Sequence, residues 1–432
     1  MRLFGSSGIR GIIGEGFTIE LAESIGGAVG SMHGRIVLGR DTRTSGPMVS
    51  QALVCGATAA GAEVHDAGMV STPTLARAAS KFGCGIMVTA SHNPAQYNGV
   101  KLWNPDGSAF DTRQMEAVEE RIDSPLPAKG WRDVGRSFAM EGAERDHIDA
   151  ILDGVDPSEA SVVVDCGCGA TFRISPLTLR ELGCSVLSLN AQPDGFFPAR
   201  TPEPTEEALA DLKAAVLRRK ADVGIAHDGD GDRMVAIDDR GRFVSGDRLI
   251  ALFASAMNAR GVVAPMDASM VLDDMVGRVE RCKVGDVYVA EALKRTGLDF
   301  GGEPSGTYIF PRQTYCPDGV LAGAMLASMA SEQKLSERLD ALPSFPSSRG
   351  SRPFRAELRD DLLRRLETEM SGLDCDRLLT LDGFRAEFPD GWLLVRLSGT
   401  EPKVRTTAEA RDEEELRRLS AMVDDIVGRC LA

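Results

Sequence analysis

The stretch that decides the fold reads Gly85-Ile86-Met87-Val88-Thr89-Ala90-Ser91-His92-Asn93-Pro94. A short apolar run that ends at small polar residues and a proline predicts a buried β-strand followed by a turn. In α/β proteins the loops at the carboxyl ends of strands carry the chemistry, so Ser91 is the candidate nucleophile. His92 is a second candidate for this site, although Ser–His pairs that act together usually meet in space rather than in sequence. The alternative is an ordinary loop serine.

The same alternation of strands and helices extends over most of the chain and predicts three tandem mixed α/β domains of similar topology. In the first, strands are expected at 35–39, near 64 and at 85–88, with helices at 47–60 and 73–82. In the second, strands are expected at 161–165, 186–189 and 223–226, with helices at 176–182 and 206–219. In the third, strands are expected at 269–272 and 298–300, around a helix at 287–295.

A Pro/Ser/Gly-rich stretch at 343–353 predicts a mobile linker before a fourth domain. Beyond it, the pattern indicates a helix at 358–370, strands at 378–381 and 392–396, and a final amphipathic helix. This is a smaller α+β unit. The four expected domains cover residues 1–145, 146–245, 246–342 and 343–432.

Composition excludes several classes of protein. The 432 residues are 43% hydrophobic, and no apolar run approaches the roughly 20 residues of a membrane span. A net charge of −15 argues against a protein that coats nucleic acid, because that affinity needs many lysine and arginine contacts. Nine scattered cysteines and an N-terminus without signal-peptide features favour a reducing cytoplasm.

A second polar loop, His227-Asp228-Gly229-Asp230-Gly231-Asp232-Arg233, follows the strand at 223–226. Three carboxylates that converge to about 5 Å repel one another by about 3 kcal/mol per pair at an effective dielectric near 20, so convergence requires a cation. Oxygen-only ligands suit Mg²⁺. The alternatives are a solvated turn with splayed carboxylates, or a calcium loop, which here lacks the glutamate that an EF-hand requires.

Two further loops carry groups that suit a sugar phosphate. In the stretch 396–405, a glycine between two hydroxyl residues is flanked by arginines, which predicts a phosphate-binding loop rather than an ordinary hairpin. In the stretch 301–306, Glu303 and Ser305 can accept and donate hydrogen bonds to sugar hydroxyls, although a plain glycine turn is the alternative. A glycine-rich N-terminal stretch contains Arg10.

These four loops, one per domain and in this order, resemble the α-D-phosphohexomutase superfamily over the whole chain. The resemblance implies a heart-shaped molecule of four domains around a central cleft. The N-terminal stretch Phe4-Gly5-Ser6-Ser7-Gly8-Ile9-Arg10-Gly11 and the 301–306 loop are most similar to the phosphoglucosamine mutase branch, especially its archaeal members.

The resemblance also implies roles for individual residues. Ser91 carries a phosphoryl group and, with Asp228, Asp230 and Asp232, binds Mg²⁺. Arg10 and Arg233 lie near the phosphoserine, and Lys101 is a general acid–base candidate whose pKa neighbouring cations or burial would lower. The implied substrate-binding residues are Glu303, Ser305, Lys283, Asp286, Arg396, Ser398, Gly399, Thr400 and Arg405.

The implied reaction moves a phosphoryl group between C1 and C6 of a hexose through a sugar 1,6-bisphosphate, which also acts as activator. The favoured substrate pair is glucosamine 6-phosphate and glucosamine 1-phosphate, with phosphomannomutase/phosphoglucomutase activity as the alternative. A catalytically inactive sugar-phosphate sensor and a metal-dependent phosphatase are further alternatives. The expected partner is a small sugar phosphate, with no nucleic acid and no membrane, and the expected assembly is a monomer or homodimer.

Overall fold

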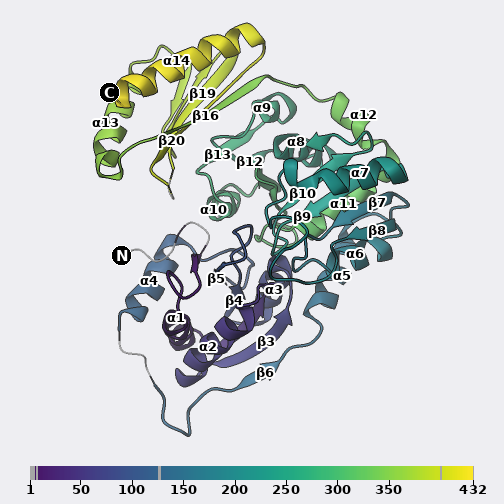
Figure 1. The fold of residues 1–432 in the computed structure, drawn as a ribbon, viewed down its shortest axis with the longest axis vertical. Coiled ribbons are helices and arrows are strands. Elements are labelled where there is room, and N and C mark those ends of the chain that lie inside the picture. Colours follow the sequence, from purple (N-terminus) through teal and green to yellow (C-terminus); the bar gives the residue numbers. More distant parts are fainter. Residues whose placement is uncertain (1–4, 6–7, 125–127, 399–400, 432) are drawn as a thin grey trace.

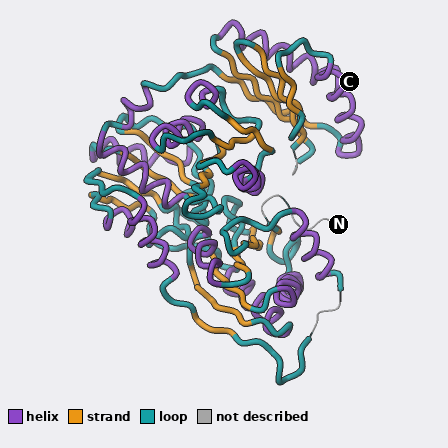
Figure 2. Tube along the Cα trace, turned by 180° about the vertical axis from the view of Figure 1, so that it is seen from behind, coloured by secondary structure: helices purple, strands orange, loops and turns teal. Residues whose placement is uncertain are grey.

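The computed structural model describes residues 5, 8–124, 128–398 and 401–431. Its strands form four separate sheets that follow one another along the chain. The sheets lie along an arc, with the first at one end and the fourth at the other (Figure 1). The view from behind shows the same arc, with helices against the sheets (Figure 2). The predicted class of three mixed α/β units and one smaller α+β unit is confirmed.

The first sheet carries Ser91 at the end of its central strand. β4 (Cys84–Val88) is buried along its whole length. It runs parallel to β2 (Arg35–Arg40) and antiparallel to β5 (Tyr97–Trp103). A strand covered on both faces is an uninterrupted apolar run, which is why the sequence pattern predicted it. The order is β1 (Ile9–Ile12), β5 (Tyr97–Trp103), β4, β2 (Arg35–Arg40), β3 (Glu63–Met69) and β6 (Ser137–Ala139). The accompanying helices are α1 (Ile19–Met32), α2 (Gly46–Ala59), α3 (Thr72–Ala78), a 3₁₀ turn (Ala79–Lys81) and α4 (Thr112–Ile122).

The second sheet ends in an antiparallel hairpin that encloses the aspartate loop. β9 (Val223–His227) enters the loop and β10 (Met234–Asp238) leaves it. The order is β11 (Phe243–Val244), β10, β9, β7 (Ser161–Asp165) and β8 (Ser185–Leu189). The helices of this unit are α5 (Ala143–Gly154), α6 (Ile174–Glu181), a 3₁₀ turn (Glu207–Leu209) and α7 (Ala210–Arg219).

One strand predicted for the third sheet is wrong. The segment 269–272 is not a strand, because it leads into the short helix α9 (Val271–Met275). The strand lies earlier, as β12 (Val262–Pro265), which is fully buried; a buried apolar run of about four residues does not by itself distinguish strand from helix. The order is β13 (Val279–Cys282), β12, β14 (Phe300–Glu303) and β15 (Thr307–Ile309). The other helices are α8 (Gly246–Ala256), α10 (Asp286–Thr296), α11 (Gly319–Glu332) and α12 (Leu335–Asp340).

The fourth sheet is antiparallel throughout. It differs from the sequence prediction in the linker at 343–353 and in the loop at 396–405. The predicted linker contains β16 (Ser347–Pro353), an exposed edge strand that pairs with β20 over all seven residues. Charged, serine-rich strands are typical of sheet edges, where composition resembles that of a linker. The predicted loop 396–405 contains strand residues at both ends. The order is β16, β20 (Lys403–Ala410), β19 (Gly391–Leu397), β18 (Phe384–Phe388) and β17 (Arg377–Leu379), with a 3₁₀ turn (Ala356–Leu358), α13 (Arg359–Ser371) and α14 (Glu413–Leu431).

The second and third sheets share one hydrophobic core. A single buried cluster extends from Ile225 on β9 and Ile174 on α6 to Phe253 on α8 and Phe300 on β14. This continuous packing fixes the aspartate loop relative to the loop after β14. The predicted domain boundaries stay predictions. None of the described helices is both long and apolar enough to cross a membrane.

Helices α1 and α2 pack against each other without intervening side chains. A Cβ atom on Gly26 would lie 2.1 Å from the Leu53 carbonyl oxygen, and one on Gly56 would lie 2.0 Å from the Glu23 carbonyl oxygen. Only glycine allows this backbone approach, which sets the distance between α1 and α2.

We therefore expect Gly56→Ala to destabilise the protein by about 2–3 kcal/mol, because the added methyl group forces the two helix backbones apart. Gly34→Ala is the matched control, since a Cβ there meets nothing within 4 Å. Thermal and urea unfolding of both variants measure the effect. Equal stabilities of the two variants would contradict this account of the α1–α2 contact.

Candidate active site

Ser91 occupies a buried and strained position after β4. Its φ of +49° lies in the left-handed region that residues other than glycine seldom adopt, and the residue is 1% exposed. The Ser91 backbone N–H donates to Thr89 Oγ1 at 2.8 Å, and the Thr89 hydroxyl donates to Asp41 Oδ2 at 2.7 Å. Side chains packed beneath the loop therefore hold the serine in place.

Arg43 is the main support of this loop, and the sequence analysis did not identify it. Its guanidinium is fully buried and donates four hydrogen bonds of 2.6–2.8 Å to the backbone carbonyls of Ser91, Asn93, Pro94 and Tyr97. Asp41 balances its charge, with 3.1 Å between Arg43 Nε and Asp41 Oδ2. The strand arrangement could have indicated Arg43. Because β2 runs parallel to β4, the polar loop after β2 lies beside the loop after β4.

The aspartate loop meets the serine loop across two sheets. The Ser91 hydroxyl donates to Asp228 Oδ2 at 2.7 Å, and Asp228 Oδ1 accepts the backbone N–H groups of Gly231 and Arg233. A Cβ on Gly229 would lie 2.6 Å from the Ser91 carbonyl oxygen, so glycine is required for this approach. The two sequence motifs thus form one site.

The three carboxylates of this loop converge and fit a metal ion. Asp228, Asp230 and Asp232 are buried, and one oxygen from each lies within 4.8 Å of the others. Asp230 Oδ1 and Asp232 Oδ1 are buried and lack a hydrogen-bond partner among the described residues. Burial and the two neighbouring carboxylates raise the pKa of Asp228 well above its ordinary value. Unsatisfied oxygens, negative charge and an oxygen-only donor set are what a hard divalent cation requires.

The Lys101 ammonium is in contact with two of the three carboxylates. Its Nζ lies 2.9 Å from Asp230 Oδ2 and 2.5 Å from Asp232 Oδ2. Burial lowers the pKa of Lys101, but Asp230 and Asp232 outweigh it and raise the pKa above its ordinary value. In this arrangement the nearest charges to Lys101 are carboxylates rather than the arginines, and the lowering expected beside a bound cation stays a prediction.

The other predicted residues around Ser91 also gather here. His92 Nδ1 lies 3.4 Å from Ser91 Oγ, and burial together with Arg233, Arg10 and Lys101 lowers the pKa of His92 to about 2, so the ring is neutral. Arg10 donates to Asn93 Oδ1 at 2.9 Å. Arg233 is next to the aspartates, which raise its pKa against the effect of burial.

Glu303 ends β14 with its carboxylate held by the neighbouring turn. The Gly285 N–H donates to Glu303 Oε1 at 2.7 Å, and the Thr307 hydroxyl donates to Oε2 at 3.0 Å. Burial and the adjacent Asp286 raise the pKa of Glu303 to about 7. Ser305 is exposed at the tip of the same loop.

Asp286 and Lys283 flank this turn differently. Asp286 is 8% exposed at the start of α10, and its charge acts on Arg10, Lys101 and Glu303. Lys283 is exposed, and its ammonium lies 5.5 Å from the Tyr288 ring. The structure thus brings Asp286 to the Ser91 site, while it places Lys283 against an aromatic ring.

A basic pocket of about 290 Å³ lies on the fourth sheet. Arg396 on β19 and Arg405 on β20 are direct partners in the ladder, and both line the pocket. Arg349 and Lys403, which the sequence analysis missed, line it too. Asp267 and Glu401 also line the pocket, and Glu401 pairs with Lys403 and Arg405. The four cations outnumber these two carboxylates, which makes the pocket suited to a phosphate.

Ser398 is buried at the end of β19, where its N–H donates to the Lys403 carbonyl at 2.8 Å. Arg359 donates to the Ser398 carbonyl at 2.9 Å. Gly399 and Thr400, the other predicted residues of this loop, lie outside the described residues.

Hydrogen bonds and a β-bridge connect the four regions into one continuous site. Arg233 forms a β-bridge with Thr307, which holds Glu303. The turn that caps Glu303 also donates its Val284 N–H to Asp382 Oδ2, which pairs with Arg396. The serine loop, the aspartate loop, the turn that holds Glu303 and the basic pocket are therefore adjacent, and the roles of their residues stay predictions.

Comparison with known proteins agrees with this arrangement. The four models of the phosphoglucomutase/phosphomannomutase family match in order: alpha/beta/alpha domain I at residues 1–128, domain II at 145–241, domain III at 245–345 and the C-terminal domain at 355–426.

Similar proteins cover the whole chain. A probable phosphoglucosamine mutase of Methanocella arvoryzae is 50% identical, over 100% of this chain and 99% of its own length. A protein of the same name from Methanosarcina acetivorans is 49% identical over 100% of both chains. The crystal structure of a phosphoglucomutase/phosphomannomutase family protein from Burkholderia thailandensis superposes with a TM-score of 0.90 and 30% identity, covering 99% of this chain and 97% of that one.

We expect Asp230→Asn to weaken binding of Mg²⁺ or Mn²⁺ by about 100-fold, because it removes one of three converging carboxylates. Isothermal titration of the full chain with each cation measures the affinity. Asp211→Asn, on the exposed face of α7, makes the same charge change elsewhere and serves as the control. Affinity equal to that of the unsubstituted protein would exclude the aspartate loop as the metal site.

Proposed function

The chain belongs to the phosphoglucomutase/phosphomannomutase family, and on that premise we propose how its residues divide the work of a phosphosugar mutase. The enzyme moves a phosphoryl group between the C1 and C6 oxygens of a hexose. The observation that carries the proposal is the 2.7 Å hydrogen bond from Ser91 Oγ to Asp228, within the three-carboxylate loop. A hydroxyl beside a site that fits a divalent cation, connected through the Glu303 turn to a basic pocket, suits phosphoryl transfer.

In the working form Ser91 carries the phosphoryl group. Asp228, Asp230 and Asp232, together with an oxygen of phospho-Ser91, would hold Mg²⁺. The bound ion draws negative charge off the transferring phosphoryl group. Arg10 and Arg233, which lie around Ser91, stabilise the remaining phosphoryl oxygens by charge and hydrogen bonding.

The substrate binds with its own phosphate in the basic pocket of the fourth sheet. Arg396, Ser398, Gly399, Thr400 and Arg405 are the proposed phosphate-binding residues, and Arg349 and Lys403 add positive charge. The free hydroxyl at the other end of the sugar then faces phospho-Ser91. Glu303, Ser305 and Asp286, with Lys283 at the edge of the turn, bind the ring hydroxyls.

Transfer from phospho-Ser91 gives a sugar 1,6-bisphosphate, which turns end over end and returns its other phosphoryl group to Ser91. Lys101 is the proposed proton carrier: its ammonium gives a proton to the Ser91 oxygen as the phosphoryl group leaves, and the resulting amine takes up the proton of the attacking sugar hydroxyl. Neutral His92 lies within 3.4 Å of Ser91 Oγ and orients it. Added sugar 1,6-bisphosphate would act as activator by phosphorylating Ser91.

We propose glucosamine 6-phosphate and glucosamine 1-phosphate as the substrate pair. The support is that the relatives about 50% identical over their whole length are named probable phosphoglucosamine mutases. The alternative is phosphomannomutase/phosphoglucomutase activity at the same residues, because the competing sugars differ at C2 alone, where one hydrogen bond can decide the preference.

A phosphatase and an inactive sugar-phosphate sensor fit the site less well. A hydrolase has no need for a second phosphate pocket that accepts the substrate in two orientations, and a sensor has no need for a hydroxyl held against three carboxylates. The nine cysteines are free, which supports the cytoplasmic location that we propose. A monomer or homodimer stays a prediction.

The test compares kcat/KM for glucosamine, glucose and mannose phosphates, with Mg²⁺ and the matching sugar 1,6-bisphosphate. We expect a preference for glucosamine phosphate of about 100-fold, equivalent to about 2.7 kcal/mol in transition-state stabilisation. Ser91→Ala should abolish turnover of all three. Equal rates on glucose or mannose phosphate would favour the alternative substrates, and activity of Ser91→Ala would remove the phosphoserine from the mechanism.

A further inference from the structure

The turn between β17 and β18 reaches from the fourth sheet onto the third. The Asp382 N–H donates to Met266 Sδ at 3.2 Å, directly after β12. Gly383 follows with a φ of +82°, and a Cβ there would lie 2.9 Å from the Arg396 Cα. This glycine lets the turn pack against the backbone of the pocket arginine, which brings the Asp382 side chain to it.

One oxygen of Asp382 joins two parts of the substrate site. Asp382 Oδ2 accepts a hydrogen bond from Arg396 Nη1 at 3.0 Å and another from the Val284 N–H at 3.3 Å. The Arg396 side chain is 16% exposed and that of Asp382 is 27% exposed, so this ion pair is only partly screened by solvent. Val284 precedes Gly285, whose N–H holds Glu303.

We propose that Asp382 is a positioning residue that orients the Arg396 guanidinium for phosphate and fixes the distance between the phosphate pocket and the turn that holds Glu303. The proposal rests on the proposed mutase function. A substrate bound at both places is held by two different sheets, so its reacting hydroxyl meets phospho-Ser91 only if their separation is fixed. Asp382 is in direct contact with both sides.

The two possible roles of Asp382, as a charge and as a positioning residue, predict opposite effects of its removal on phosphate binding. A carboxylate beside a phosphate site repels the anion, so its removal should tighten phosphate binding. A positioning role predicts weaker binding instead, because Arg396 loses the acceptor that orients its donors. The two accounts therefore differ in the sign of the effect.

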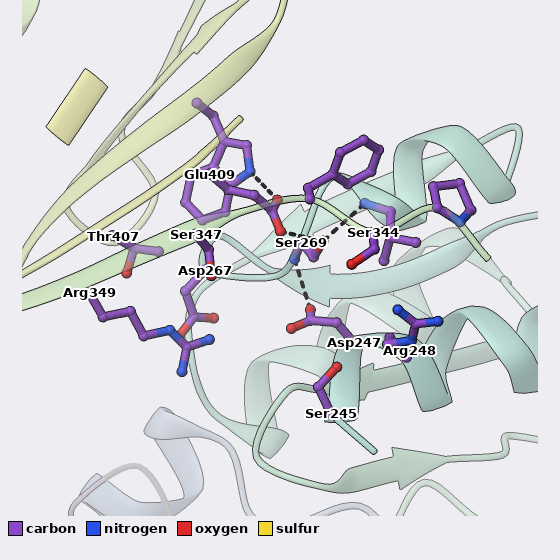
Figure 3. Close-up of a pocket in the computed structure, with 14 residues that line it drawn as sticks. Ser245, Asp247, Arg248, Asp267, Ser269, Ser344, Ser347, Arg349, Thr407 and Glu409 are labelled. Atoms are coloured by element: carbon purple, nitrogen blue, oxygen red, sulfur yellow. Dashed lines mark hydrogen bonds between the residues drawn. The ribbon is translucent and has the colours of Figure 1, made fainter. Parts of the chain in front are cut away.

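Asp267 offers a matched control for the charge effect. It lines the same basic pocket, and Figure 3 shows it beside Arg349 near Thr407. Burial raises the pKa of Asp267, while Arg396 and Arg349 act to lower it, so its carboxylate faces the same cations. Its Oδ1 is buried without a hydrogen-bond partner among the described residues. Asp267→Asn thus removes a negative charge but leaves the bonds of Asp382 intact.

Docking of the fourth sheet does not depend on Asp382 alone. Arg385 donates to the Met266 and Ala268 carbonyls at 2.6 and 2.9 Å. Glu409 accepts the Ser269 hydroxyl and the Met270 N–H at 2.6 and 2.7 Å, and the first of these residues lies beside Glu409 in Figure 3. Substitution of Asp382 should therefore leave the two sheets docked.

The experiment compares Asp382→Asn, Asp382→Ala and Asp267→Asn at pH 8 in the full chain. For Asp382→Ala, which removes the acceptor, we expect KM for the sugar phosphate to rise about 10-fold while kcat falls less than about 3-fold. Asp382→Asn keeps one acceptor oxygen but loses the charge, so its rise in KM should be smaller, about 3-fold. Binding of inorganic phosphate should weaken in parallel. Hydrogen exchange in the segment containing Val284 should accelerate by about 10-fold, whereas Asp267→Asn should lower KM and leave this exchange unchanged.

Three outcomes would overturn the proposed role of Asp382. An unchanged or lower KM in the Asp382 variants would mean that charge alone matters, and an equal rise in Asp267→Asn would mean that any change at the pocket has this effect. A melting temperature lowered by more than about 5 °C in both Asp382 variants would assign Asp382 to folding instead. If the unsubstituted enzyme turns over no sugar phosphate, the proposed function fails separately, and phosphate binding and hydrogen exchange still decide the role of Asp382.

Discussion

The convergence of three buried carboxylates is the constraint on which the rest of the structure depends. At separations up to 4.8 Å, each charged pair would repel by about 3–4 kcal/mol at an effective dielectric of 20. The arrangement persists because backbone N–H groups, the Thr72 hydroxyl, the Ser91 hydroxyl and the Lys101 ammonium all point at these oxygens. Two carboxylate oxygens still lack partners, which makes a divalent cation the natural complement.

Residues that do not touch the reacting groups hold this cluster in place. β4 and β9 each end at the site, and each carries one half of the Ser91–Asp228 contact. Arg43 fixes the serine loop through four carbonyls, and the core shared by the second and third sheets fixes the aspartate loop against Glu303. Buried polar groups whose hydrogen bonds are all formed hold a single geometry. Phosphoryl transfer requires such a fixed geometry between the donor and the acceptor.

Sequence reasoning found the parts of the site that are local in the chain. Ser91 follows one buried strand and the three aspartates follow another. The glycine at position 229, between two of the aspartates, is needed because the aspartate loop approaches the backbone of Ser91 closely. It missed Arg43 and Asp382 because their partners lie about 50 and 100 residues away, so no local pattern indicates them. The edge strand β16 looked like a linker because an exposed edge needs no apolar side chains. The sequence also did not reveal that the nearest charged neighbours of Lys101 are Asp230 and Asp232, because these residues lie about 130 positions further along the chain.

The most direct test of the central claim is a crystal structure of the Ser91-phosphorylated enzyme grown with Mn²⁺ in place of Mg²⁺, with an anomalous difference map at the manganese edge. We predict one peak bonded to oxygens of Asp228, Asp230, Asp232 and phospho-Ser91, with the Lys101 ammonium displaced from at least one carboxylate. A map with no peak at these oxygens, or with the cation held elsewhere and Lys101 still bonded to both aspartates, would contradict the claim that the cluster is built to hold a cation beside the phosphoserine.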